Sequence, residues 1–278
     1  MSFRDIILQV DETDAASGRC ALAVDLATQW GATLTGVFLR SHFTYDLFAA
    51  EGLAYLPKHE IEAALTESAA AVKLAADVAE QTLRIAAERA GASFEWRIID
   101  GNSDAALIAA ARRADLSILP PRIETSRGGR CVSATTLALA SGGPTLIVPE
   151  EGEWRGMPKR VLIAWKNTRE SARALHDAWP FLDAAEEVTV IVVSPSGMSG
   201  TDGFLERHME RHGRKTQVIV DHSDDVSVGK VLRRQIKALN ADLLVMGLYG
   251  RSRLREMILG GVSRELLGEP PVPLLASH

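Results

Sequence analysis

The part of the sequence best suited to chemistry is a glycine-rich segment that follows a short apolar run. The run ends at Gly247, Gly250 comes next, and Gly260 and Gly261 lie beyond an arginine-rich stretch that begins at Arg251. Glycine lets the backbone approach a ligand closely. A glycine-rich turn that leads into a helix presents unpaired N–H groups and a positive dipole end to an anion. The spacing therefore predicts a cradle for a phosphate group.

Apolar runs alternate with helical patterns along the chain, and this alternation predicts the elements that position the segment. Five runs predict strands in the first half, at 5–10, 34–39, 94–99, 116–119 and 145–148. A long alanine-rich helical pattern covers 58–90 and is closed by Gly91. Strands that alternate with helices are typical of a doubly wound α/β fold with a parallel sheet. Ligands of such sheets bind at the carboxyl ends of the strands.

The same order of signals starts again after a polar stretch at 150–158, which we interpret as a linker. Five further runs predict strands in the second half, at 160–165, 188–193, 217–220, 241–247 and 272–276. A chain of 278 residues is long enough for two domains, which we predict at 1–150 and 151–278. We expect the run at 272–276 to lie at a sheet edge and to pair there, within or between chains.

The composition excludes several classes of protein. Hydrophobic residues make up 46% and charged residues 24% of the chain, as in an ordinary globular protein. A net charge of −5 argues against a general binder of nucleic acid or of anionic membranes. Neither a secretory leader nor a membrane-spanning run is recognised, so we expect a cytoplasmic protein. Cys20 and Cys131 are expected to be buried, reduced thiols.

The glycine spacing, Gly247-x2-Gly250-x9-Gly260, resembles the nucleotide-binding signature of the universal stress protein family, Gly-x2-Gly-x9-Gly-Ser/Thr. Together with the repeat, the resemblance covers nearly the whole chain. It implies a tandem member, with two five-stranded doubly wound domains that form an intramolecular pseudo-dimer. One position departs from the signature. The Ser/Thr after the third glycine is Gly261 here, and the nearest hydroxyl belongs to Ser263.

The resemblance implies that the second half binds ATP or another adenine nucleotide, with or without Mg²⁺. An acidic residue that follows the first strand in the family is Asp11 in the first half and Lys166 in the second. The glycine positions correspond to Pro120, Ile123 and Ser133 in the first half, so we expect no cradle there and assign Asp11 a capping or bracing role. The candidate binding residues are Gly247, Gly250, Arg251, Gly260, Gly261, Val262, Ser263, Lys166, Trp165 and Val193.

Alternatives remain for two of these side chains and for the function. Lys166 could hold a phosphate or pair with Asp221, and Trp165 could stack on a planar ligand or fill the space of the adenine. The alternative function is an interaction module that binds no nucleotide and acts through an unknown protein partner. Its glycines would then serve the strand-to-helix turn alone. The chain could also form a homodimer.

Catalytic and metal-binding groups are not apparent in the sequence. No nucleophile–base pair or Walker lysine is found, so we nominate no catalytic residue and expect at most slow ATP hydrolysis. His208 and His212 have the spacing of a helical pair of metal ligands. Because no third ligand can be assigned, we interpret them as part of a solvated, charged helix face.

Overall fold

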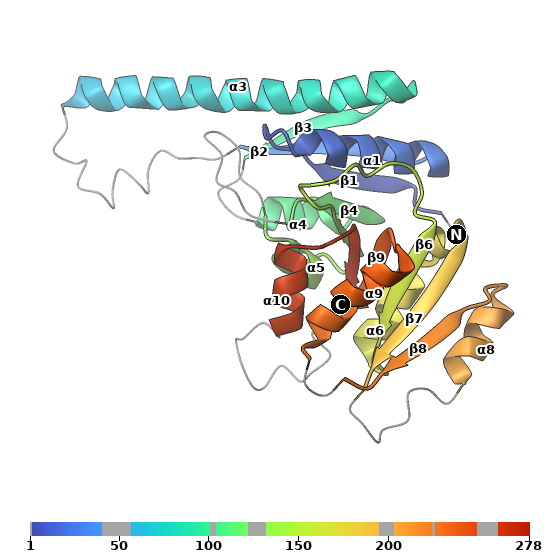
Figure 1. The fold of residues 1–278 in the computed structure, drawn as a ribbon. Helices are drawn as coiled ribbons and strands as arrows, with labels where there is room; N and C mark the ends of the chain where they lie inside the picture. The colour runs from blue at the N-terminus through green and yellow to red at the C-terminus, as the bar shows by residue number, and fades with distance from the viewer. Residues whose placement is uncertain are drawn as a thin grey trace.

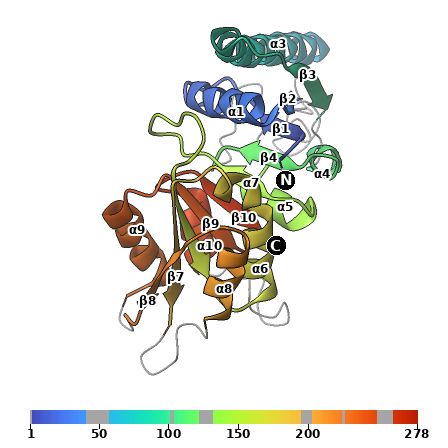
Figure 2. The same cartoon turned by 90° about the vertical axis from the view of Figure 1, so that its right-hand side faces the viewer.

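A single ten-stranded sheet forms the centre of the computed structural model, with helices on both faces (Figures 1 and 2). The structure describes residues 2–40, 57–100, 104–121, 132–194, 203–223, 226–248 and 261–278. The strand order is β3-β2-β1-β4-β5-β10-β9-β6-β7-β8. Neighbouring strands are parallel throughout this sheet except for the central pair, β5 and β10, which is antiparallel.

The first half supplies five strands and its own set of helices. Its strands are β1 (Asp5–Gln9), β2 (Thr33–Arg40), β3 (Glu95–Asp100), β4 (Leu116–Leu119) and β5 (Thr145–Ile147). Its helices are α1 (Ala16–Trp30), α3 (Lys58–Ala90), α4 (Ala105–Ala111) and α5 (Ala134–Ala140). Helices α1 and α3 end at Gly31 and Gly91, whose φ angles of 62° and 63° are left-handed and suit glycine.

The second half repeats this order. Its strands are β6 (Arg160–Trp165), β7 (Glu187–Val193), β8 (Gln217–Asp221), β9 (Leu243–Gly247) and β10 (Leu274–Ser277). Its helices are α6 (Arg169–Asp177), α7 (Trp179–Leu182), α8 (Phe204–Arg211), α9 (Val228–Leu239) and α10 (Gly261–Gly268). Each predicted strand is present and begins and ends within two residues of its predicted bounds. The doubly wound α/β fold is confirmed.

Two apolar cores hold the layers together, one on each face of the sheet. Helices α1, α3, α6, α7 and α8 contribute buried residues to one core, and α4, α5, α9 and α10 contribute to the other. Cys20 is free and buried in the first core, as predicted, while Cys131 lies outside the described residues. Figure 1 shows α3 running past the end of the sheet. None of the described helices is both long enough and apolar enough to cross a membrane.

The expectation that the last strand lies at a sheet edge is wrong. Strand β10 pairs with β5 on one side, Leu274 with Ile147, and with β9 on the other, Leu274 with Leu244. All four residues of β10 are buried, because apolar layers cover both faces of the sheet here. The edges of the sheet are β3 and β8. The pairing expected for this strand therefore occurs within the chain and joins its two halves.

Candidate functional site

The order of the strands brings the residues after β6 and the glycine segment after β9 together at the carboxyl ends of these two neighbouring strands. Strand β6 lies between β7 and β9. The chain therefore continues from β6 to β7 on one side of β6 and later adds β9 on its other side, so the strand order reverses at β6. Such a reversal opens a crevice at the carboxyl ends of the two strands. Trp165 ends β6 and Gly247 ends β9, and the preceding residues, Ala164 and Met246, are paired. Lys166 follows directly after Trp165.

Gly247 lies where helix α6 contacts the sheet. A Cβ atom at this position would lie 2.4 Å from the carbonyl carbon of Glu170 and 2.5 Å from the backbone nitrogen of Ser171. Both are backbone atoms of the first turn of α6, which cannot move aside as a flexible side chain would. The packing of α6 therefore requires glycine here, whether or not a ligand binds.

The rest of the glycine segment is described only at its far end. Gly250, Arg251 and Gly260 lie outside the described residues. Helix α10 begins at Gly261, so Val262 and Ser263 belong to its first turn. The segment therefore connects the carboxyl end of β9 to the N-terminus of α10, which is the strand-to-helix connection that the spacing predicts.

The other candidate residues follow the ends of neighbouring strands. Lys166 is exposed, and its backbone N–H donates to the Ser171 hydroxyl at 3.2 Å. Trp165 is half-buried and packs against the core on the α6 face of the sheet. Val193 ends β7 and is half-buried. Within the described ranges, no acidic side chain forms an ion pair with Lys166.

The suggested pairing of Lys166 with Asp221 is wrong. Asp221 ends β8, and its carboxylate accepts from Arg234 at 2.5 Å and from the Ser223 backbone N–H at 3.0 Å. Hydrogen bonds from Ser223, opposed by burial and reinforced by Arg234, hold the pKa of Asp221 below its usual value. The carboxylate is already satisfied by residues of its own neighbourhood.

Glu170 lies near the carboxyl ends of β6 and β9, and the sequence did not indicate it as a candidate site residue. It lies in the first turn of α6, where Thr168 caps the helix by accepting from the Ser171 backbone N–H at 3.4 Å. Burial raises the pKa of Glu170, but hydrogen bonds from its own backbone N–H and from Thr168, with the charge of Arg169, lower it overall. Only the cap pattern Thr168-x-x-Ser171 could have placed Glu170 at a helix start. The sequence alone does not show that the first turn of α6 packs against Gly247.

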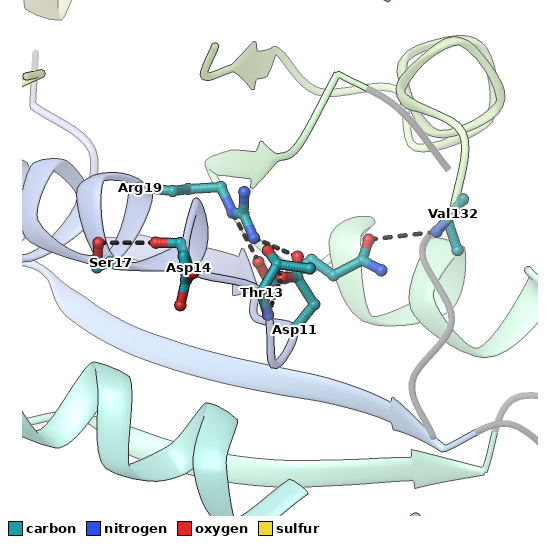
Figure 3. Close-up of polar contacts among 7 residues, drawn as sticks. Asp11, Thr13, Asp14, Ser17, Arg19 and Val132 are labelled. Atoms are coloured by element: carbon teal, nitrogen blue, oxygen red, sulfur yellow. Dashed lines mark hydrogen bonds and ion pairs between the residues drawn. The ribbon is translucent and has the colours of Figure 1, made fainter. Parts of the chain in front are cut away.

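In the first half, Asp11 occupies the position that Lys166 has in the second half, and its carboxylate is bound by neighbouring side chains and backbone (Figure 3). Asp11 is 4% exposed, accepts from the Thr13 backbone N–H at 3.0 Å and forms an ion pair with Arg19, which is 1% exposed. The Arg19 Nε donates to the Gln9 carbonyl at 3.2 Å, and the Gln9 side chain accepts from the Val132 backbone N–H at 3.3 Å. Asp11 therefore braces the first half, as predicted, and its charge is neutralised within the chain.

His208 on α8 and His212, which follows the end of α8, belong to a larger group of rings. The ring centroids of His208 and His212 are 4.8 Å apart, and that of His176 on α6 is 5.8 Å from His208. Trp179 lies 4.5 Å from His212. The interpretation as a simply solvated face was therefore incomplete. Within the described part of the chain, no three His, Cys, Asp or Glu side chains are grouped so that they could hold a metal ion.

A cavity of about 220 Å³ lies away from these strand ends, at the junction of the two halves. Its walls include α1 and the residues 153–158 that connect β5 to β6. Leu22 and Leu26 of α1 are 3% and 0% exposed, so solvent hardly reaches this wall. Arg155, the basic residue of its lining, is paired with Asp25 at 3.0 Å. The cavity is therefore a poor phosphate site.

A comparison with known families decides the identity of the second half. The sequence model of the universal stress protein family matches residues 157–278, which contain β6 to β10. Residues 157–278 form a universal stress protein domain. No curated protein matches the chain by sequence.

Solved structures that match nearly the whole chain share the architecture of both halves. A universal stress protein from Archaeoglobus fulgidus DSM 4304 has a TM-score of 0.69 at 18% identity, over 98% of this chain and 96% of that one. A functionally unknown protein from Pseudomonas aeruginosa PAO1 has a TM-score of 0.58 at 16% identity, over 99% and 92%. The tandem arrangement of two universal-stress-type halves is consistent with these matches. A universal stress protein in complex with cAMP has a TM-score of 0.33 at 19% identity.

Proposed function

We propose that the universal stress protein domain binds an adenine nucleotide, or a similar phosphate-bearing ligand, at the carboxyl ends of β6 and β9. One observation carries this proposal. The reversal of strand order between β6 and β9 lies where the glycine segment leaves Gly247 and leads to the N-terminus of α10. Crevices of this kind are the usual ligand sites of open α/β sheets, and a helix N-terminus favours an anion.

Each candidate residue has a role in this proposal. The backbone N–H groups of Gly250, Gly260 and Gly261 would bind the phosphates, and Arg251 would add positive charge. Ser263 in the first turn of α10 would offer the remaining hydroxyl. Lys166, exposed after β6, would pair with a phosphate in place of the acidic residue that contacts the ribose in nucleotide-binding relatives.

The base would then contact the apolar strand ends. Trp165 and Val193 close β6 and β7 and are both half-buried, so each keeps some surface for a planar ligand. Glu170, on the helix turn that packs against Gly247, pairs with Arg169 at 3.3 Å and would add a carboxylate near the phosphates. This favours binding together with Mg²⁺, which phosphates and carboxylates hold jointly.

We expect one ligand per chain, bound in the second half. In the first half, Arg19 occupies the Asp11 carboxylate, and Pro120 at the end of β4 lacks the N–H group that a cradle needs. We further propose that the protein acts in the cytoplasm.

Two measurements test the proposal. The protein is purified without added nucleotide and denatured, and released small molecules are identified by mass spectrometry. ATP, ADP, AMP and cAMP are then titrated by calorimetry, with and without Mg²⁺. We expect a stoichiometry near one, abolished by Gly250→Asp, which adds bulk and negative charge to the cradle. Ile123→Asp, the corresponding change in the first half, should leave binding intact. Unchanged affinity of the Gly250→Asp protein would show that the site is assigned wrongly.

A second candidate function is a module that binds a protein partner, including a second copy of the chain. Helix α3 favours it, because three large aliphatic side chains on its outer surface are exposed: Leu74 by 65%, Val78 by 43% and Ile85 by 39%. Purified protein that carries no nucleotide and gives no heat with any of the four ligands would favour this module over nucleotide binding.

A further inference from the structure

Three imidazole rings from two helices meet on the outer face of the second half. His208 lies between the other two, with ring centroids 5.8 Å from His176 and 4.8 Å from His212. Trp179 joins them, at 6.2 Å from His208 and 4.5 Å from His212. We call these four residues the histidine cluster. We propose that the histidine cluster is a pH-sensitive latch, which holds α8 against α6 and α7 when the imidazoles are neutral and releases it when they are protonated.

The geometry explains why the neutral state fits the cluster. The rings of His208 and His212 are tilted against each other and against the Trp179 indole, with interplanar angles of 31° to 57°, as in packed aromatic clusters. The Nε2 atom of His208 is buried and has no hydrogen-bond partner among the described residues. Both ring nitrogens carry a proton in the imidazolium form, so a charged His208 would hold a buried Nε2–H for which no described residue supplies an acceptor, and such burial is costly.

The charges around His208 also favour its neutral form. Burial lowers the pKa of His208, and the positive charges of His212, His176 and Arg211 lower it further. On α6, Asp177 is engaged by Arg173, whose Nε lies 2.9 Å from its carboxylate. The carboxylates on α8 are Glu206 and Glu210, and neither contributes to this shift.

After α7, the nearest acidic residue is Asp183. Its backbone carbonyl accepts from Arg214, which follows α8 and brings a further positive charge. Arg207 on α8 is directed over the ring of Phe204, at 4.6 Å from its centroid. The cationic groups of α6 and α8 therefore outweigh the carboxylates that act on the cluster.

Among the described residues, α8 buries two apolar side chains, so the histidine cluster makes up a large share of the packing of this helix. Leu205 and Met209 are the buried residues of this eight-residue helix. Arg214 donates from Nη1 to the Ala185 carbonyl at 3.0 Å, beyond the helix end. Segments with so few buried contacts open at low free energy, and a modest electrostatic change shifts their equilibrium.

The sign of the effect follows from the direction of the shift. A histidine whose pKa is lowered by folding stabilises the folded segment above its ordinary value of about 6.5. That contribution is lost as the pH falls through the lower, folded value. For one proton, the opening equilibrium of α8 rises by up to about tenfold per pH unit within this window. In a universal stress protein domain, acidification of the surroundings is then the stimulus that the latch detects. The latch does not depend on nucleotide binding.

Histidine titration by NMR tests the electrostatic half of the proposal. The full chain, labelled at its seven histidines, is titrated from pH 8 to pH 4.5 and assigned with single variants. We expect the midpoint of His208 below about 6.5, and we expect it to rise in His176→Gln and in His212→Gln. His59→Gln, at an exposed position in the first turn of α3, is the control and should leave the midpoint unchanged. A midpoint of His208 that neither variant moves would overturn the proposal.

Hydrogen exchange tests the mechanical half. Amide exchange of α8, corrected for the intrinsic rate, is measured at pH 7.5 and pH 5.5 in the full chain and in His208→Phe. The phenylalanine keeps the ring contacts and cannot take a proton, and circular dichroism at pH 7.5 confirms that the variant is folded. We expect acid-induced opening of α8 in the unmodified protein and none in the variant. Equal protection at both pH values, or the same opening in His208→Phe, would refute the latch.

Discussion

The buried ion pair of the first half allows a sharp test of how its two charges are balanced. Arg19 and Asp11 are 1% and 4% exposed, so neither can be hydrated if its partner is removed. Arg19→Met keeps the length of the aliphatic stem and leaves the Asp11 carboxylate buried with hydrogen bonds from Thr13. Breaking a buried pair in this way costs about 3–5 kcal/mol of unfolding free energy. We expect Arg19→Met to lower the free energy of unfolding by an amount in that range.

The double variant Arg19→Met, Asp11→Asn separates the cost of burying the Asp11 carboxylate without Arg19 from the contribution of the ion pair. The asparagine side chain would keep an oxygen that accepts from the Thr13 N–H, and no charge would remain buried. Replacement of both partners of a buried pair by neutral groups is often close to neutral. We therefore expect the double variant to lie within about 1–2 kcal/mol of the unmodified protein, well above Arg19→Met alone.

Urea unfolding followed by circular dichroism and tryptophan fluorescence measures these differences. Arg84→Met is the control, because Arg84 pairs with Glu80 on the surface of α3 with 47% and 32% of the two side chains exposed. Such an exposed pair contributes about 0–1 kcal/mol. If Arg19→Met cost no more than Arg84→Met, or if the double variant were less stable than Arg19→Met, the reasoning about an uncompensated charge would be refuted.

Three further changes test single features of the fold. Gly247→Ala forces the backbone of α6 away from β9 and should cost about 1–3 kcal/mol in urea unfolding, whereas Gly268→Ala, with open space around its Cβ position, should cost nothing. Asn240 ends α9 with a left-handed φ of 47°, so Asn240→Ala should lower the melting temperature and Asn240→Gly should not. The low pKa of Asp221 implies a contribution to stability that is present above about pH 4 and lost as the pH falls below it. Arg234→Met should weaken this acid dependence in pH-dependent thermal unfolding, and an unaltered pH profile would contradict the assigned pairing.

The elements could be predicted because each is encoded locally. The apolar period of α3 and Gly91, which supplies the left-handed cap, predict this helix from the sequence. Strand β10 was equally clear as an apolar run, but its place in the sheet was not. A buried run shows that both faces are covered, and it does not show which strands lie beside it. The position of β10 in the sheet depends on its pairing with β5, a contact between residues far apart in the sequence.

The polar features that were missed depend on contacts between distant residues. Arg19 lies in a helix and would ordinarily be exposed, and only the position of Asp11 beside it explains its burial. His176 is separated from His208 by a whole strand and helix connection, so the spacing of His208 and His212 could not indicate a third ring. The motif spacing predicts Gly247 as a ligand-binding position, whereas its contact with the backbone of α6 requires glycine for a reason that the spacing cannot supply.

The central position of β10 has a consequence for how the protein is made. Strand β5 is complete once Ile147 has been synthesised, but its antiparallel neighbour begins only at Leu274. Until then the nascent first half carries an open, apolar strand edge that can pair with the same edge of another nascent chain. Correct assembly on the ribosome therefore depends on the second half arriving before a neighbouring polypeptide does. Slow translation of the second half is expected to favour domain-swapped products over monomers.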